Sequence, residues 1–387
     1  MGPGPRRIVV VGYGIAGLTA ADSLRAGGFD GDLTVVGEER HHPYSRPALS
    51  KSALVESGDM TAHELPAPTH DAFERLGVAA TGLDAQRRVV ALADGGELPY
   101  DGLVIASGSR AARLADRLPV ADDVDELVLR TVDDALLLRD RVQGQPSVVV
   151  VGGGPLGMEV ASGCLAAGCD VTVVAQGRPL TRLLGPFLAE LFVAAGLRRG
   201  LRVTTAAAVR VRSQGGLSVV ELADGSTVSG DLLISAVGDV PNTGWLVSSG
   251  LLAGDDLVVD SRGRVRPDVV AAGDVCAFPT PQGVRRIPLW TSAIEQSKVA
   301  ALGLLRGDEA AELDYQPYFW TEQFGLNFKS VGVMPVAGPP ELIEGDPGDA
   351  AALMRWRFAD GAASAAALNY RIPVPRLRRL ATAQAVG

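Results

Sequence analysis

Two stretches of the chain combine a short apolar run with an abrupt glycine-rich turn. In the first, residues 8–11 are apolar and rich in valine, and Gly-Tyr-Gly-Ile-Ala-Gly follows at 12–17. In the second, four valines at 148–151 precede Gly-Gly-Gly-Pro-Leu-Gly at 152–157. Short β-branched runs are typical of buried strands, and the alanine-rich stretches that follow are typical of helices. The pattern therefore predicts two strand–turn–helix units.

Both turns have the Gly-x-Gly-x-x-Gly spacing that dinucleotides need. The first glycine makes the tight turn, the second lets backbone approach a pyrophosphate, and the third lets the helix pack on the strand. One such turn is weak support, because glycine-rich turns are common in α/β proteins, whereas two copies favour two dinucleotide sites. The residues expected to bind cofactor here are Gly12, Gly14, Ala16 and Gly17, and then Gly152, Gly154 and Gly157.

The polar residues after the next strand add a candidate ribose ligand. A helix is predicted over 16–26, ending at Gly27-Gly28, and a strand over 33–36. Glu38 follows Gly17 by 21 residues, where the acid that holds a ribose hydroxyl pair is expected. An exposed turn carboxylate is the alternative, and the pattern does not fully separate Glu38 from Glu39.

Composition and charge narrow the class of protein. The 387 residues, 47% of them hydrophobic, suffice for about two or three domains, and no run reaches the ~18 apolar residues of a membrane span. The start of the chain leaves no room for the apolar core of a signal peptide, and three cysteines argue against a disulfide framework, so we expect a cytoplasmic protein. A net charge of −9 argues against nonspecific nucleic-acid binding.

One cluster of positive charge stands out in this acidic chain. The exposed-helix pattern near the end of the chain carries four arginines, at 371, 376, 378 and 379. Such a patch can dominate within a Debye length of roughly 8–10 Å, so an acidic protein partner stays open beside the simpler interpretation of a solvated helix face.

The irregular segment 41–51 follows the first nucleotide-binding unit and carries two cations. Arg46 could pair with a pyrophosphate through its planar fork, and Lys51 could donate to a redox ring nitrogen or stabilise an anionic reduced ring. Two surface cations are the alternative. His41 and His42 lack the accompanying ligand spacing of a metal centre, so we interpret them as surface residues and expect no metal site.

Residues 43–51 resemble the Pro-Tyr-x-Arg-Pro-x-Leu-Ser-Lys signature of FAD-dependent ferredoxin and rubredoxin reductases, which serve monooxygenases and dioxygenases. Further similar stretches lie at 101–110, 233–243, 271–275, 290–296 and 317–325. The resemblance implies an α/β fold with two Rossmann-like three-layer dinucleotide-binding domains and a small α+β C-terminal domain. It places a discontinuous FAD domain at 1–113 and 242–312, an NAD(P)H domain at 114–241, and an interface domain at 313–387.

The same resemblance implies roles for single residues. Asp274 would bind the ribityl chain of a tightly but non-covalently bound FAD, and Trp290 would begin a helix lying against the flavin. Glu159, beside the nicotinamide and flavin rings, and Lys51 would be the catalytic pair; Ser107 and Arg130 are added to the expected cofactor-binding residues. The alternatives are a turn residue for Asp274, a core position for Trp290, and for Glu159 a helix N-terminal acid favoured by the macrodipole.

Cys164 and Cys169 have the spacing of the disulfide of glutathione reductases but stand on the helix of the second unit. After the first unit, where that disulfide would lie, the chain has Ala-Leu-Ser-Lys at 48–51. We therefore expect the two cysteines to be a helix-core residue and a C-terminal turn residue, and disulfide reductase chemistry is disfavoured.

The chain departs from the family pattern in two places. Where the family usually carries a glutamate that selects NADH, residues 175–178 are Ala-Gln-Gly-Arg. This removes a repulsion against a 2′-phosphate that Arg178 could attract, so we lean towards NADPH or dual use over NADH alone. Pro288-Leu289 replaces a polar or acidic pair before Trp290, which affects the flavin environment.

The resemblance implies an NAD(P)H:ferredoxin oxidoreductase. Electrons would pass from NADPH or NADH through FAD to a [2Fe–2S] or similar ferredoxin that serves a monooxygenase or dioxygenase. The alternatives are an NAD(P)H oxidase or a flavoenzyme reducing a small acceptor directly, and, as a poor fit, a flavoprotein with an interaction role like the apoptosis-inducing factors. No nucleic-acid or membrane partner is expected, and a homodimer is possible.

Overall fold

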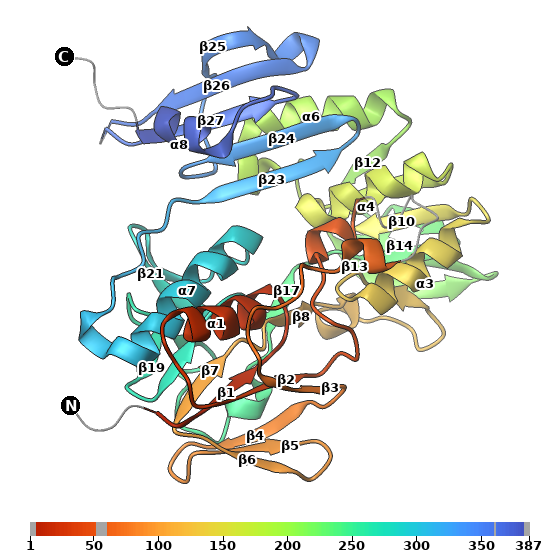
Figure 1. Ribbon diagram of the computed structural model, residues 1–387. Coiled ribbons are helices and arrows are strands. Elements are labelled where there is room, and N and C mark those ends of the chain that lie inside the picture. Colours follow the sequence, from red (N-terminus) through yellow and green to blue (C-terminus); the bar gives the residue numbers. More distant parts are fainter. Residues whose placement is uncertain (1–4, 52–59, 360, 383–387) are drawn as a thin grey trace. The chain divides into compact units, whose positions relative to one another are not determined.

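The computed structural model describes residues 5–51, 60–359 and 361–382, which form two compact units. The first unit holds residues 5–45, 63–110 and 240–315, and the second holds the rest of the described chain. Two paired strands, β8 (Ser109–Ala111) and β17 (Asp239–Pro241), carry the chain out of the first unit and back into it (Figure 1). Both units are therefore built from segments that are distant in sequence.

The first unit is built on a six-stranded sheet. Its order is β19 (Arg264–Arg266), β20 (Val269–Ala271), β7 (Gly102–Ile105), β1 (Arg7–Val11), β2 (Asp32–Gly37) and β3 (Phe73–Leu76), all parallel except β19. Helices α1 (Ile15–Ala26) and α7 (Trp290–Arg306) pack together on one face (Figure 1). Along β1, Ile8 and Val10 enter the core on the helix side while Val9 and Val11 enter the opposite core, so the strand is apolar throughout.

Two smaller groups of strands accompany this sheet. They are β4 (Ala80–Asp84), β5 (Val89–Leu92) and β6 (Glu97–Pro99) in one group, and β21 (Cys276–Thr280) paired with β18 (Leu257–Val258) and β22 (Gly283–Arg285) in another. Their pairing is antiparallel except for the parallel pair of β18 and β21. The fully buried Tyr100 and Phe278 belong to the core between them and the central sheet.

The nucleotide-binding part of the second unit repeats the plan with a five-stranded parallel sheet. Its order is β12 (Arg202–Thr205), β11 (Asp170–Ala175), β10 (Ser147–Val151), β16 (Leu232–Ser235) and β9 (Glu126–Leu127). The helices are α3 (Val132–Val142), α4 (Pro155–Ala166), the short α5 (Thr181–Leu184) and α6 (Pro186–Arg198). A three-stranded antiparallel sheet, β13 (Ala208–Gln214), β14 (Leu217–Leu222) and β15 (Thr227–Gly230), is inserted before β16.

The last part of the second unit is a five-stranded antiparallel sheet followed by a helix. The order is β23 (Tyr318–Gln323), β24 (Leu326–Val331), β27 (Ala363–Leu368), β26 (Ala351–Arg357) and β25 (Glu341–Asp346), and α8 (Val374–Thr382) packs on β27 (Figure 1). A two-residue turn with positive φ at Phe324 and Gly325 joins β23 to β24, as the twist of a tight hairpin requires. The predicted small sheet followed by a basic helix is confirmed.

The predicted fold class is confirmed, and the expected strands and helices differ from the structure only at their ends. Pro47 lies in a single 3-10 turn, η1 (Arg46–Ala48). The boundaries of the three domains stay predictions. Within the described ranges no helix is long and apolar enough to cross a membrane, and no group of three or more His, Cys, Asp or Glu side chains could hold a metal ion.

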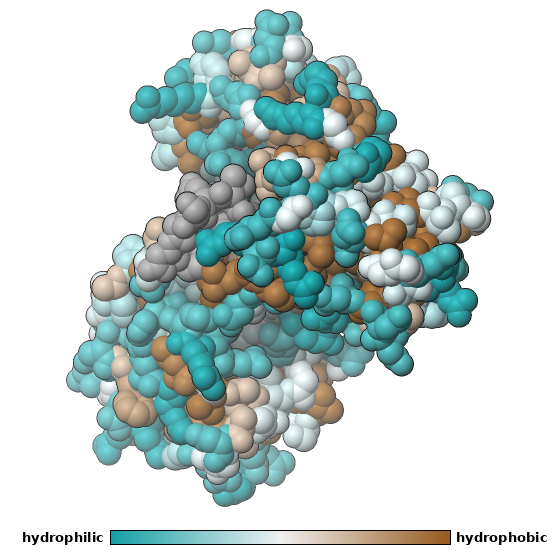
Figure 2. Space-filling view, turned by 90° about the vertical axis from the view of Figure 1, so that its right-hand side faces the viewer, coloured by the Kyte–Doolittle hydropathy of each residue, from teal (hydrophilic) through white to brown (hydrophobic). Residues whose placement is uncertain are grey.

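The surface carries both hydrophilic and hydrophobic residues. Figure 2 shows the two kinds interspersed on one face, with hydrophilic residues the more extensive. The most exposed large hydrophobic side chains, Phe73 and Val247, stand on separate elements. Apolar atoms normally make up much of a folded surface, so these isolated side chains carry no functional signal.

Candidate functional site

The first glycine turn joins β1 to α1 and has no room for side chains at its ends. Gly12 has a φ of +105°, and a Cβ there would lie 2.1 Å from the Ala106 carbonyl oxygen; one at Gly17 would lie 1.8 Å from the Gly12 oxygen. Gly14 is the N-cap of α1; no side chain of the described chain caps this helix, and its first turn carries no acidic residue. The backbone N–H groups there are suited to an anion such as a pyrophosphate.

The second turn, between β10 and α4, has the same construction and an open space as well. A Cβ at Gly152, whose φ is +126°, would lie 2.1 Å from the Ala236 oxygen, and one at Gly157 would lie 2.0 Å from the Gly152 oxygen. At Gly154, the N-cap of α4, a Cβ would meet no heavy atom within 4 Å. This open position beside an uncapped helix N-terminus is what the close approach of a phosphate group needs. Both turns thus fit a dinucleotide.

Glu38 and Glu39, which the sequence could not separate, have different surroundings. Glu38 directly follows β2 and is exposed. Glu39 is half-buried, and its Oε2 accepts a hydrogen bond of 2.5 Å from the Tyr44 hydroxyl. Its partnership with Tyr44 makes Glu39 the less available of the two, so Glu38 remains the candidate ribose ligand.

Asp274 lies next to the first glycine turn. It follows β20 through Gly273, whose φ is +85° and whose Cβ would lie 3.0 Å from the Ala16 Cβ and 3.7 Å from the Ala293 Cβ. The carboxyl ends of β1 and β20 therefore bring Asp274, α1 and the first turns of α7 together. The Asp274 side chain accepts a 3.4 Å hydrogen bond from Ser109, and its backbone oxygen accepts one of 2.7 Å from Arg286 Nε.

Two further expected residues belong to the same unit. Trp290 is half-buried and is the first residue of α7, as predicted. Ser107 follows β7; its hydroxyl donates to the Asn242 carbonyl oxygen at 3.0 Å and accepts from Trp245 Nε1 at 3.4 Å. Ser107 therefore ties together two segments at the carboxyl end of the sheet.

The second unit contains a buried ion pair. Lys51 Nζ lies 2.9 Å from Glu159 Oε2, and only 14% of the lysine side chain and 7% of the glutamate side chain are exposed. Lys51 also donates to the Pro47 oxygen at 3.0 Å, and the Ser50 hydroxyl donates to Glu159 Oε2. The structure thus brings together the two residues expected to be catalytic. A pair of this kind orients its members more than it stabilises the fold.

Sequence reasoning missed two residues of this cluster. Thr321 on β23 donates to Glu159 Oε1 at 2.5 Å, and Gln323 Nε2 donates to the Thr321 hydroxyl at 2.9 Å. Both side chains are buried, whereas Glu322 between them is exposed. Polar residues on the inward face of a strand are the signal that could have identified them.

The Arg46 side chain is hydrogen-bonded to the backbone of Arg130. Arg46 Nη1 donates to the Arg130 oxygen at 2.8 Å, and Arg130 N donates to Asp134 Oδ2 at 2.9 Å. These bonds fix η1 to the segment that leads into α3. Both arginines belong to the second unit, as Lys51 does.

Arg178 lies after β11, at the end of the strand where coenzyme specificity is expected to be set. It forms an ion pair with Glu190 of α6, and the two side chains are 46% and 57% exposed. Gln176 and Gly177 are exposed as well. The position is open to a ligand, but the guanidinium already has an acidic partner that the sequence did not suggest.

The cysteines have no redox arrangement. All three are free and buried, and burial raises the pKa of the Cys164 thiol to about 12. Cys169 N donates to the Cys164 oxygen at 3.0 Å past Gly168, whose φ is +89°, which is the usual way of closing a helix C-terminus. The prediction of a helix-core residue and a turn residue is confirmed. Thiols that stay protonated are poor nucleophiles.

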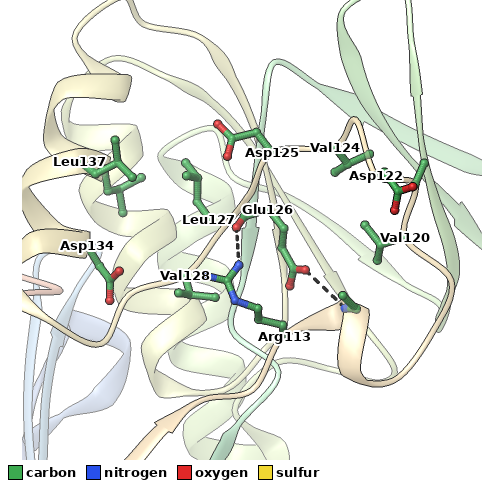
Figure 3. A pocket seen from close by; sticks show the side chains of 13 residues that line it. Arg113, Val120, Asp122, Val124, Asp125, Glu126, Leu127, Val128, Asp134 and Leu137 are labelled. Atoms are coloured by element: carbon green, nitrogen blue, oxygen red, sulfur yellow. Dashed lines mark hydrogen bonds between the residues drawn. The ribbon is translucent and has the colours of Figure 1, made fainter. Parts of the chain in front are cut away.

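A hollow of about 450 Å³ lies beside β9 and α3 (Figure 3). Three of its four carboxylates are already committed: Glu126 accepts from the backbone N–H of Leu114 at 2.6 Å, Asp125 pairs with Arg141 at 2.7 Å, and Asp134 caps α3. Arg113 donates to the Glu126 backbone oxygen at 2.8 Å. None of the residues expected to be functional lines this hollow, so we do not place the chemistry there.

Comparison with known proteins identifies the family. The profile described as "Pyridine nucleotide-disulphide oxidoreductase" matches residues 6–297. The ferredoxin–NAD(+) reductase component of the anthranilate 1,2-dioxygenase system of Burkholderia cepacia is 35% identical, over 98% of this chain and 94% of that protein.

Comparison with solved structures supports the same family assignment. The ferredoxin reductase for the CYP199A2 system from Rhodopseudomonas palustris is 28% identical, over 94% of this chain and 91% of that chain, with a TM-score of 0.86. The covalent putidaredoxin reductase–putidaredoxin complex is 25% identical, over 98% and 94%, with a TM-score of 0.86. The family expected from the sequence motifs is confirmed. The chain belongs to the pyridine nucleotide-disulphide oxidoreductase family, where its relatives include ferredoxin reductase components of oxygenase systems.

Proposed function

We propose that this chain is the reductase of an oxygenase electron-transfer system, taking electrons from NAD(P)H with the help of bound FAD and delivering them to a ferredoxin. The observation that carries the proposal is the buried Lys51–Glu159 pair, together with two turns that each fit a dinucleotide. Its lysine lies in the segment after the first nucleotide unit, at the place in the sequence where a disulfide reductase would carry cysteines. The three cysteines are buried, and none lies in that segment, which disfavours electron transfer through a disulfide.

The two units would hold different dinucleotides. In the first unit the residues proposed to hold FAD non-covalently are Gly12, Gly14, Ala16, Gly17, Glu38, Ser107, Asp274 and Trp290. Arg46, Lys51 and Arg130 of the second unit stay predicted cofactor-binding residues. The turn at Gly152, Gly154 and Gly157 of that unit would hold the transient coenzyme. A bound flavin supplies the exchange between a two-electron donor and a one-electron acceptor.

The donor is NADPH or NADH. No acid stands at 175–178 to bond the adenosine ribose or repel a 2′-phosphate, and Arg178 is half-exposed at that place. This supports NADPH or dual use, even though the dioxygenase reductase compared above is named for NAD(+).

The acceptor is a [2Fe–2S] or similar ferredoxin serving a monooxygenase or dioxygenase. Support comes from two similar proteins, one a ferredoxin reductase by name and one solved in covalent complex with putidaredoxin. An NAD(P)H oxidase or a flavoenzyme reducing a small acceptor directly is the alternative. A homodimer stays a prediction that the single described chain does not test.

Three measurements test the function. The visible spectrum of the purified protein reports bound flavin, and anaerobic titration with NADPH and NADH reports which coenzyme reduces it. Stopped-flow reoxidation then compares a [2Fe–2S] ferredoxin with oxygen. We expect fast reoxidation by the ferredoxin; fast reoxidation by oxygen with none by the ferredoxin would establish the oxidase instead.

A further inference from the structure

Glu159 is held by side chains from two separate segments of the chain. Ser50 and Lys51 donate to Oε2 from the segment after η1, and Thr321 lies 2.5 Å from Oε1 on β23. Thr321 is completely buried. Both carboxylate oxygens therefore have hydrogen-bond partners. The partner of Oε1, Thr321, belongs to the C-terminal sheet.

Gln323 extends this hydrogen-bond network. Its Nε2 donates to Thr321 Oγ1 at 2.9 Å, and a hydroxyl has a single proton to give. Thr321 gives that proton to Glu159, while the Lys51 ammonium and the Ser50 hydroxyl give theirs to the other oxygen. Glu159 thus accepts hydrogen bonds at both of its carboxylate oxygens.

A second contact sets the register between β23 and α4. Phe324 N donates to the Ser162 hydroxyl at 2.7 Å, and Ser162 lies on the same face of α4 as Glu159, three residues on. Side chains alternate along a strand, so a slip of one residue would put Trp320 or Glu322 in the place of Thr321. The register of β23 on α4 therefore determines that Thr321 is the residue that faces the Glu159 carboxylate.

We propose that Thr321 is a positioning residue that fixes the orientation of Glu159, so that the C-terminal sheet completes the reducing site. The inference rests on the proposed function, in which Glu159 lies beside the reacting rings. A carboxylate with hydrogen bonds to both of its oxygens stays in one rotamer. Such a fixed position is needed because a displacement of a reacting group by about 1 Å can greatly slow a reaction. Gln323 acts one step further away by orienting the threonine hydroxyl.

The test compares three variants by stopped-flow reduction of the holoenzyme. T321V removes the hydroxyl at nearly constant volume, T321S keeps it, and S364A removes another buried hydroxyl of the same sheet, one that donates to the Val333 oxygen at 2.6 Å. Loss of a hydrogen bond to a charged group should lower the limiting rate of flavin reduction by about ten-fold or more in T321V, with little change in coenzyme Kd. T321S should restore most of the rate, and S364A should resemble the wild type.

Infrared spectroscopy of protein labelled with 13C-glutamate gives a readout other than activity. The Glu159 carboxylate band, located by subtracting the spectrum of E159Q, should shift in T321V and stay in place in S364A. A T321V protein with the wild-type rate and an unshifted band would overturn the inference. A wild-type holoenzyme that neither coenzyme reduces would instead refute the proposed function.

A further variant keeps the inference testable if T321V does not fold. Q323M removes the donor that orients Thr321 but leaves the hydroxyl in place. We expect a smaller loss in the limiting rate with an unchanged coenzyme Kd, and an unaltered rate in a folded Q323M protein would count against the network.

Discussion

The Lys51–Glu159 ion pair is buried, and this decides what a substitution there does to stability. Replacing Lys51 with Met leaves a carboxylate of which only 7% is exposed without its cation, although Ser50 and Thr321 still donate to it. Breaking a buried pair from one side typically costs about 3–5 kcal/mol. We expect K51M to lower the free energy of unfolding by an amount near the lower end of that range.

The double variant K51M/E159Q separates charge from packing. It removes the carboxylate together with its cation, so it should regain a large part of the stability lost in K51M. Urea unfolding of both variants, monitored by circular dichroism, measures the difference. If the single and double variants lose the same free energy of unfolding, the loss of packing by the lysine stem, and not the unpaired charge, causes the destabilisation.

Gly12 and Gly154 both stand in glycine turns, but substitution by Ala should affect them differently. A Cβ at Gly12 would lie 2.1 Å from a backbone oxygen at a φ of +105°, so G12A should disturb the fold of the first unit and abolish flavin binding. At Gly154 a Cβ meets no heavy atom within 4 Å, and its φ of −77° suits any residue. G154A should therefore fold normally.

The effect of G154A should appear only when coenzyme binds. Its methyl group occupies the space proposed for the pyrophosphate, so KM for the nicotinamide coenzyme should rise while Tm and flavin content stay at wild-type values. Thermal unfolding, the visible spectrum and steady-state kinetics check the three quantities. An unchanged KM would place the pyrophosphate elsewhere.

At the scale of elements, the sequence predicted what local patterns control. The runs at 8–11 and 148–151, each followed by a glycine turn, correctly predicted β1, β10, α1 and α4, because apolar period and turn chemistry are both local signals. The contact of Thr321 with Glu159 spans 162 residues and depends on the register of β23 on α4. No local pattern contains that register, so the contact could not be predicted.

The pairing of Arg178 with Glu190 is a second contact between elements that the sequence did not predict. It joins the loop after β11 to α6, and it uses the guanidinium that was expected to attract a 2′-phosphate. Exposed ion pairs are worth about 0–1 kcal/mol, so Glu190 would weaken the proposed binding of a 2′-phosphate by Arg178 without preventing it. E190Q should raise the ratio of kcat/KM for NADPH to that for NADH by about two- to five-fold.

The opposite substitution provides the control for this prediction. R178A removes the cation from the same pair, so it should lower the NADPH:NADH ratio and leave kcat/KM for NADH nearly unchanged. If E190Q and R178A alter the ratio in the same direction, Arg178 does not contact the 2′-phosphate.

At the scale of the whole molecule, the protein is acidic, but one helix near its C-terminus presents a basic surface. The net charge is −9, yet Arg371, Arg376, Arg378 and Arg379 are all exposed on or next to α8. The buried face of this helix is formed by Leu377 and Ala381, which pack in the core beneath the C-terminal sheet, so the arginines are not needed for its packing. A basic surface on an acidic protein is suited to an acidic partner, as an electron-carrying ferredoxin would be.

Reversing two of these charges tests that interpretation. In R376E/R379E, opposite charges no longer guide the encounter, so the second-order rate of ferredoxin reduction should fall at low ionic strength by about ten-fold or more, and its dependence on salt should weaken. Flavin reduction by NAD(P)H, which does not involve the partner, should be unchanged. The matched control is R198E/R210E, which reverses two exposed arginines on α6 and β13 and alters the net charge equally. Equal slowing in both variants would show that total charge, and not α8, governs the encounter.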